Sequence, residues 1–248
     1  MIPGKAQRAG NRARVAVLIG LGLIAAAALG FAVERRESAE TPAVTKKSEL
    51  MLLTSLPLVF GEQFGLEGGG SPALKAIEER YKVRPISVTD AKTLGRGRLL
   101  LMAHPMAQPA EMLVDLDRWV RGGGRVVLIA DPFLEWPSER PLGDPLRPPP
   151  AFADTGLLGH WGLRLDAPDE RGPKLLSLGG KDVLTDSPGR LFGGCPISED
   201  RLVAHCRIGK GNATIIADAD FLNVDSLDGP TADNLNGLLA ELATLGQR

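Results

Sequence analysis

LLLMAHPMAQPAEMLVDLDRWVRGGGRVVLIADP, residues Leu99 to Pro132, is the stretch that decides the fold of this chain. Its two apolar runs, 99–103 and 126–130, show no alternation and therefore predict strands that are buried on both faces. Between them, apolar residues recur every three or four positions after Pro109, as in an amphipathic helix that ends at the glycines 122–124. A strand, a helix and a strand with short joints predict a right-handed βαβ unit in a parallel sheet.

The glycines at 122–124 do not indicate a phosphate-binding loop. Such loops precede a helix, whose free N–H groups bind the anion, whereas these glycines follow a helix and precede a strand. Gly95-Arg96-Gly97 and Gly209-Lys210-Gly211 also lead into predicted strands. The sequence therefore predicts no directly bound nucleotide and no other cofactor.

The whole chain of 248 residues has a formal net charge of −1, but its N-terminal region differs in charge from the rest. Residues 1–36 hold six basic residues and one acidic residue, so the remainder is an acidic body with few aromatic residues, a poor nucleic-acid binder. The uncharged run Val15–Val33 has 19 residues, enough to cross a hydrocarbon core. We therefore predict a cytoplasmic tail at 1–12 and a single transmembrane helix at 13–33. The alternative is a signal peptide that is cleaved near Gly30-Phe31-Ala32.

The body is predicted to be one α/β domain at 49–248, reached through a polar linker at 34–48. Its sheet is expected to be mostly parallel and flanked by helices, with short antiparallel β segments added to the sheet in the second half. Seven prolines between residues 132 and 150 predict a long irregular loop. The other expected elements are strands at 50–60 and 83–88, helices at 72–82, 151–161 and 231–245, a short helix or turn at 90–94, β segments at 174–178, 181–185 and 190–193, and a hairpin at 202–217.

Polar residues at the carboxyl ends of predicted strands form a candidate ligand crevice, because ligands bind at that edge of open parallel sheets. The candidates are Glu62, His104, Asp131, Asp218 and Asp220. One hypothesis joins His104, Asp131 and Asp218 in a small polar or metal site. In the alternative, the aspartates cap loops and helices, and His104 is a half-buried loop residue. Motifs for a serine nucleophile and for a His-Glu-x-x-His zinc site are absent, and we assign no catalytic residue and no metal.

Two further features lie outside that crevice. The proline-rich loop at 132–150 carries Trp136 and Arg140 and is a candidate interaction surface, or else a flap that covers a sheet edge. Cys195 and Cys206 are the only cysteines and flank a presumed turn, so outside the cytoplasm they can form a disulfide. The alternative is a pair of buried free thiols.

Three segments together resemble a known bacterial family over roughly residues 50–245. They are LMLLTSLPLVFGE at 50–62, the central unit with the loop that follows it, and GKGNATIIADADFLN with TADNLNGLL near the end. They resemble the uncharacterised ABC-type transport system domain of gliding-motility-type auxiliary proteins. The resemblance implies a class I glutamine-amidotransferase-like fold that is anchored in the membrane and works with separate permease and ATPase subunits of an ABC transporter.

The resemblance also implies that catalysis has been lost. Amidotransferases of this fold place a cysteine in an elbow after the central strand and a His-x-Glu pair late in the chain, where this sequence has Asp131-Pro132 and Asp218-Ala219-Asp220. We therefore expect a non-enzymatic accessory or binding domain on the periplasmic side of a bacterial inner membrane. The alternatives are a divergent hydrolase that uses His104, Asp131 and Asp218, and an envelope module that binds partners through the proline-rich loop.

Overall fold

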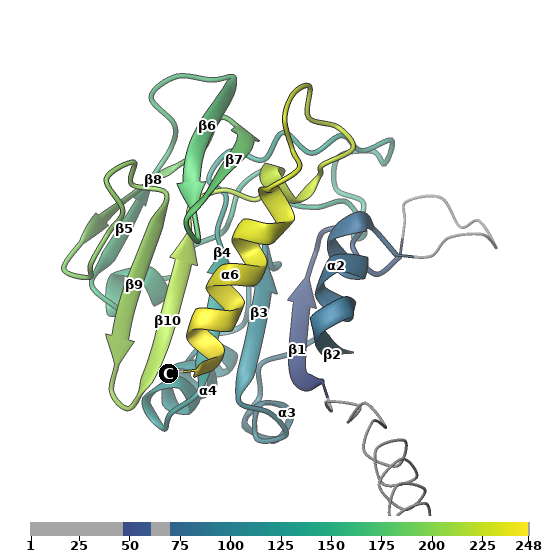
Figure 1. Ribbon diagram of the computed structural model, residues 1–248. Coiled ribbons are helices and arrows are strands. Elements are labelled where there is room, and N and C mark those ends of the chain that lie inside the picture. Colours follow the sequence, from purple (N-terminus) through teal and green to yellow (C-terminus); the bar gives the residue numbers. More distant parts are fainter. Residues whose placement is uncertain (1–46, 61–69, 248) are drawn as a thin grey trace, which may run out of the picture. The chain divides into compact units, whose positions relative to one another are not determined.

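The computed structural model describes residues 47–60 and 70–247 (Figure 1). The predicted tail and transmembrane helix, nearly all of the linker, and Glu62 lie outside these residues. Across the two described segments, no helix combines the length and the apolar character that a membrane crossing requires. The compact unit that contains the described residues is 47–248, and its fold is as follows.

A six-stranded sheet forms the centre of the unit, with strand order β2-β1-β3-β4-β10-β9. Neighbouring strands are parallel except β9, which pairs antiparallel with β10 at one edge. The remaining strands form two separate antiparallel pairs, β5 with β8 and β6 with β7. The strands are β1 (Ser48–Thr54), β2 (Tyr81–Pro85), β3 (Leu99–Ala103), β4 (Arg125–Ile129), β5 (Leu163–Asp166), β6 (Pro173–Leu178), β7 (Lys181–Asp186), β8 (Arg190–Gly193), β9 (Val203–Ile208) and β10 (Gly211–Ile216).

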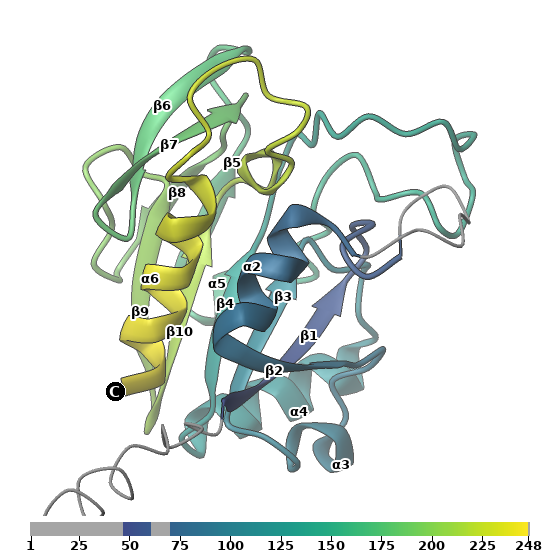
Figure 2. The same ribbon diagram turned by 45° about the vertical axis from the view of Figure 1, so that its right-hand side comes forward.

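Helices cover both faces of this sheet, as the two views in Figures 1 and 2 show. Helices α2 and α6 pack on one face, and α3, α4 and α5 pack on the other, so each face has its own apolar core. Strand β1 serves both cores, because Leu50 and Leu52 point to one and Met51 and Leu53 to the other. The helices are α2 (Pro72–Arg80), α3 (Ala91–Leu94), α4 (Ala110–Arg121), α5 (Leu157–His160) and α6 (Asn234–Gln247), with the 3-10 helix η1 at Asp220–Leu222.

The strands of the central βαβ unit, β3 and β4, are parallel, as the apolar runs 99–103 and 126–130 predict. The strands β1 and β2, which α2 joins, are parallel as well. Helix α2 begins as the sequence indicates, because the Ser71 hydroxyl accepts a hydrogen bond from the Leu74 N–H at 3.1 Å and Pro72 occupies the first turn. Helix α4 also ends at the glycines. The left-handed residue there is Gly123, with φ of 111°, while Gly122 keeps helical backbone angles.

Several predicted boundaries are wrong for local reasons. Strand β1 ends at Thr54 and not near residue 60, because the Thr54 hydroxyl accepts a hydrogen bond from the Leu56 N–H and turns the chain. The helix expected at 151–161 is reduced to α5, a single turn that follows Gly156 with φ of 101°. The antiparallel segments are not added to the main sheet except for β9; the others form their own two-stranded sheets.

Candidate functional site

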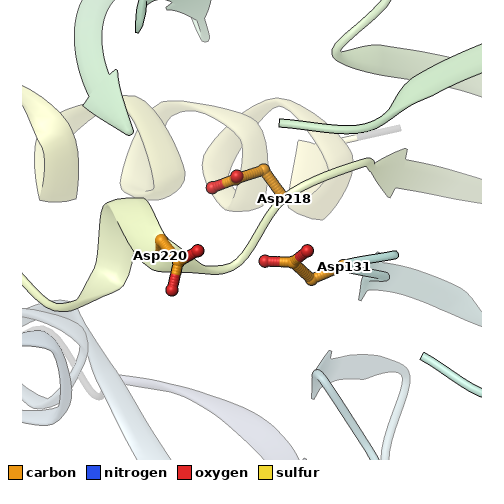
Figure 3. A group of neighbouring side chains, drawn as sticks. All are labelled: Asp131, Asp218 and Asp220. Atoms are coloured by element: carbon orange, nitrogen blue, oxygen red, sulfur yellow. The ribbon is translucent and has the colours of Figure 1, made fainter. Parts of the chain in front are cut away.

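Three aspartates gather beyond the carboxyl ends of the neighbouring parallel strands β4 and β10 (Figure 3). Asp131 follows β4, whereas Asp218 follows β10 and Asp220 opens η1. Each offers one carboxylate oxygen, and these oxygens lie within 4.8 Å of one another. Asp131 and Asp218 are fully buried, and Asp220 is 3% exposed. The structure therefore brings together three of the five crevice residues that the sequence nominates.

Asp131 ties the loop after β4 to the loop after β10. Its Oδ1 accepts a hydrogen bond from the Phe133 N–H at 2.8 Å, and its Oδ2 accepts one from the Ala219 N–H at 2.9 Å. Both bonds come from backbone donors that lie beyond strand ends, where no ladder partner is available. Asp131 thus has the loop-capping role that the sequence suggests, and it also faces the other two carboxylates.

Only one of the two carboxylate oxygens of Asp218 accepts hydrogen bonds from the described residues. Its Oδ1 accepts hydrogen bonds from the Thr185 hydroxyl on β7 and from the Phe221 N–H at 3.3 Å. Its Oδ2 is buried and has no hydrogen-bond partner within the described part of the chain. A buried carboxylate oxygen without a donor is costly, because the lost hydration is not replaced. This oxygen is the strongest sign that the site is built for something besides loop capping.

Asp220 connects the site to the proline-rich loop. Its Oδ2 accepts a hydrogen bond from the Glu135 N–H at 3.0 Å. The Glu135 side chain is exposed and accepts a hydrogen bond from the Ser187 hydroxyl at 2.8 Å. Glu135 therefore lies at the outer rim of the three buried aspartates.

Burial raises the pKa of all three aspartates, and their mutual repulsion adds to the effect for Asp218 and Asp220. The pKa of Asp131 rises to about 6 and that of Asp220 to about 8, while that of Asp218 is well above its usual value. Burial, with the charge of Glu135, also raises the pKa of Asp186 at the end of β7. In the described segments, none of these five carboxylates forms an ion pair with a basic side chain, so their negative charge is not balanced locally.

His104 does not join the aspartates, which corrects the predicted His104/Asp131/Asp218 site. It is fully buried rather than half-buried, with a φ of 45°. Its Nε2 lies 2.8 Å from the carbonyl oxygen of Pro149, and its backbone carbonyl accepts a hydrogen bond from the Ser55 hydroxyl. Burial lowers the pKa of His104, which favours the neutral ring. Because the carbonyl oxygen of Pro149 can only accept, Nε2 carries the proton and donates it. His104 holds the end of the proline-rich loop against β3.

The other predicted site residues have separate places. Trp136 is half-buried and packs against the core under α2 and α6. Arg140 lies near Asp144, with Nη1 3.6 Å from Oδ2. Cys195 and Cys206 are joined as a disulfide, with 5.1 Å between their Cα atoms.

Sequence reasoning missed the residues that support the aspartates from other elements. Thr185 donates to Asp218, and the Asn234 amide donates to the carbonyls of Leu184 and Phe221 at 2.7 and 2.9 Å. Asn234 thus clamps β7 to η1 from the first residue of α6. One signal was available in the sequence. Polar residues, Thr185-Asp186-Ser187, stand at the end of the predicted β segment 181–185, just as the aspartates stand after the ends of predicted strands.

No protein-family model matches this chain, and no curated protein matches it. Solved structures with a similar arrangement include an exo-β-1,4-mannosidase from Opitutaceae bacterium strain TAV5, with 12% identity and a TM-score of 0.48. A β-galactosidase from Bacillus circulans sp. alkalophilus has 14% identity and a TM-score of 0.47. The matches cover 84% and 82% of this chain but only 37% and 31% of the enzymes, so the chain spans about a third of their length.

A cytoplasmic protein from Salmonella typhimurium is similar over 79% of this chain and 98% of its own length, with 10% identity and a TM-score of 0.48. At such identities and TM-scores, no activity or location is carried over to this chain. The α/β sheet is compatible with these comparisons, but none of them returns the predicted family.

These findings overturn the assignment to an amidotransferase-like, ABC-transporter-associated domain. No family model and no curated protein returns such a domain, and the similar solved structures named above include none of this kind. The expectation that the domain has lost catalysis is withdrawn as well, because a missing amidotransferase triad is informative only for a member of that family. The predicted membrane-anchored, periplasmic placement is corrected with it, because it rested on that resemblance and on the segment 13–33, which lies outside the described residues.

Proposed function

We propose that this domain binds one divalent cation through Asp131, Asp218 and Asp220. The observation that carries the proposal is the fully buried Oδ2 of Asp218, which has no donor within the described residues and belongs to a group of three close carboxylates. A cation at this point supplies the missing partner to Asp218. It also compensates the negative charge, which no lysine or arginine of residues 47–60 and 70–247 balances through an ion pair.

The ligand chemistry favours a hard cation. Three carboxylates offer only oxygen, which suits Mg²⁺, Ca²⁺ and Mn²⁺ rather than the metals that prefer thiolate or imidazole. Metal–oxygen bonds of about 2.0–2.6 Å allow two ligand atoms of one ion to lie up to about 4–5 Å apart. The spacing of these carboxylate oxygens, within 4.8 Å, is in that range. Three protein ligands leave coordination positions for water.

Cation binding is tested by thermal unfolding and titration calorimetry on the full chain, after treatment with EDTA and with Mg²⁺, Ca²⁺ and Mn²⁺ added separately. An ion that binds only the folded state adds about 2.7 kcal/mol at one hundred times its Kd, or a Tm rise of about 5–10 °C for a domain of this size. Asp218→Asn removes one ligand charge with little change in shape and should weaken binding by at least tenfold.

Asp228→Asn is the matched control, because Asp228 is exposed and is not among the three grouped aspartates. It should leave both the Tm shift and the calorimetric affinity unchanged. Equal responses of Asp218→Asn and the unmodified chain, or no response of the unmodified chain to any of the three ions, would contradict the proposal.

A second candidate function, metal-assisted hydrolysis at the same ion, is favoured by Glu135. Its exposed carboxylate lies close enough to Asp131, Asp186 and Asp220 for its charge to raise the pKa of all three. A carboxylate beside a metal-bound water can act as the general base that deprotonates it.

Hydrolysis is tested with p-nitrophenyl acetate, bis-p-nitrophenyl phosphate and p-nitrophenyl β-galactoside in the presence of Mn²⁺. Glu135→Gln should abolish turnover while Mn²⁺ binding persists. The hydrolysis proposal would be contradicted if turnover survived in Glu135→Gln or was the same with EDTA. Neither result would contradict the proposal that the site binds a cation.

A further inference from the structure

A groove opens at the same edge of the sheet, beyond the ends of β1 and β3. None of the three aspartates of the proposed cation site lines it. The chain leaves β1 in one direction toward β2 through α2, then crosses back to β3 and continues the other way through α4. In open α/β sheets, such a reversal of strand order leaves a crevice at the carboxyl ends of the two strands, and ligands bind there. The crevice between β1 and β3 is this reversal point.

The groove has the size and the lining of a small-molecule site. It encloses about 440 Å³, and typical ligand pockets range from about 300 to 1,000 Å³. Three of the six large apolar side chains that are exposed among the described residues line it, namely Phe60, Met106 and Leu146. Leu56 and Ile86 add apolar wall from the segments that follow β1 and β2.

Side-chain hydrogen bonds join the ends of the two strands where they border the groove. The Thr54 hydroxyl donates to the carbonyl of Ala103 at 2.9 Å, and the Ser55 hydroxyl donates to the carbonyl of His104. Thr54 and Ser55 both line the groove. A preformed cavity lowers the entropic cost of binding, since the wall does not have to be ordered by the ligand.

Among the described residues that line the groove, Arg140 is the one basic residue. It belongs to the proline-rich loop, its side chain is 20% exposed, and Asp144 lies 3.6 Å from its guanidinium on the same loop. A guanidinium in an apolar wall is suited to a carboxylate, sulfonate or phosphate on an otherwise apolar molecule, because charge-assisted hydrogen bonds are strong where water is scarce.

We propose that this groove binds a small amphipathic molecule, whose apolar body lies against Leu56, Ile86 and Met106 and whose anionic group is bound by Arg140. The proposal does not depend on the cation site. It assigns the proline-rich loop a direct role in ligand recognition, through Arg140 and Leu146.

Two fluorescent probes of nearly the same shape test it on the full chain in EDTA, so that the cation site does not contribute. 8-Anilinonaphthalene-1-sulfonate carries an anionic group, and N-phenyl-1-naphthylamine lacks it. We expect one saturable site for each. Arg140→Gln should weaken binding of the sulfonate about tenfold and change that of the neutral amine less than twofold. Met106→Glu should weaken both probes about tenfold, because it places a charge in the apolar wall.

Leu175→Glu is the control for Met106→Glu, since Leu175 is a similarly exposed apolar residue on β6 that does not line the groove. It should change neither affinity. Asp144→Asn is an independent test of the anion contact: removing a carboxylate that competes for Arg140 should tighten sulfonate binding and leave the amine unchanged. The proposal is overturned if Met106→Glu changes neither affinity, if Arg140→Gln affects both probes equally or neither, or if Asp144→Asn fails to tighten the sulfonate.

Discussion

Asp218 shows, at the scale of one residue, that a buried carboxyl group can favour the binding of a cation. The same group destabilises the folded protein when no cation is bound. Its Oδ1 has two donors, but its Oδ2 has none among the described residues and shares a buried space with Asp131 and Asp220. Desolvation and like charge both act against ionisation of such a group. Each side chain of the group therefore lowers the free energy of unfolding when it is ionised and unpaired.

This balance makes Asp218→Asn an unusual substitution, because it should stabilise the cation-free protein. The asparagine Oδ1 can keep the bonds from Thr185 and Phe221, and its N–H₂ can donate toward the other carboxylates. We expect the free energy of unfolding in EDTA at pH 8 to rise by about 1–2 kcal/mol, measured by urea denaturation. A loss of stability under these conditions would show that the Asp218 charge is already compensated in the folded protein.

At the scale of elements, the packing of α4 on β10 depends on a glycine. A Cβ on Gly211 would lie 2.1 Å from the carbonyl oxygen of Val120 and 2.2 Å from that of Gly124. Both are backbone atoms, so neither can move without shifting the end of α4. The nearby backbone bonds from Lys210 to Arg121 and from Asn212 to Gly124 hold the same joint.

Gly211→Ala should therefore destabilise the domain by about 2–3 kcal/mol, as overpacking of a rigid contact does. Gly159→Ala on α5 is the matched control, because nothing lies within 4 Å of its added Cβ. Urea denaturation should show the loss only for Gly211→Ala. Equal stabilities of the two variants would mean that α4 and β10 are not in close contact.

The disulfide acts on the edge of the sheet, because it joins the segment after β8 to β9. Replacing both Cys195 and Cys206 by alanine should lower the free energy of unfolding by about 2–3 kcal/mol, since the unfolded chain regains the freedom of a loop of about a dozen residues. The unmodified protein should lose a similar amount on reduction, and the double variant should be insensitive to reductant. Two reactive thiols in unfolded, unreduced protein from an oxidising compartment would contradict the bond.

At the scale of the whole molecule, the buried aspartates predict an inverted pH dependence of stability. Their native pKa values, about 6 for Asp131 and about 8 for Asp220, exceed the unfolded value near 3.9. The folded state keeps protons that the unfolded state has lost, so this stabilisation is complete below about pH 4 and is lost as the pH rises toward 8. Each carboxyl group protonated only in the folded state contributes a slope of about −1.4 kcal/mol per pH unit.

The measurement is the free energy of unfolding in EDTA between pH 6.5 and 8.5. This window avoids His104, whose lowered pKa makes stability rise with pH up to about 6.5. Stability should fall across the window, and a saturating divalent cation should reverse the trend, since its binding displaces protons from the carboxyl groups. A flat profile in EDTA would show that the aspartates are ionised and compensated in the folded state.

The parallel sheet could be read from local patterns. The runs 99–103 and 126–130 are apolar without alternation, and only a strand covered on both faces buries such a run completely. The amphipathic repeat in α4 and the Ser71-Pro72 start of α2 are also local signals, because cap and stripe depend on neighbouring residues. The family resemblance, in contrast, led to a transporter role that the comparisons do not return.

The grouping of the aspartates was decided by the tertiary structure. Asp131 and Asp218 are 87 residues apart in the sequence, and they meet because β10 pairs with β4 in a register that ends both strands together. His104 follows the neighbouring strand β3, so the sequence pattern alone made it a candidate crevice residue like the aspartates. Its φ of 45° and its bond to Pro149 belong instead to the closure of the proline-rich loop. Strand identity is encoded in short apolar runs, whereas the direction of a side chain at a strand end depends on loops that arrive from distant parts of the chain.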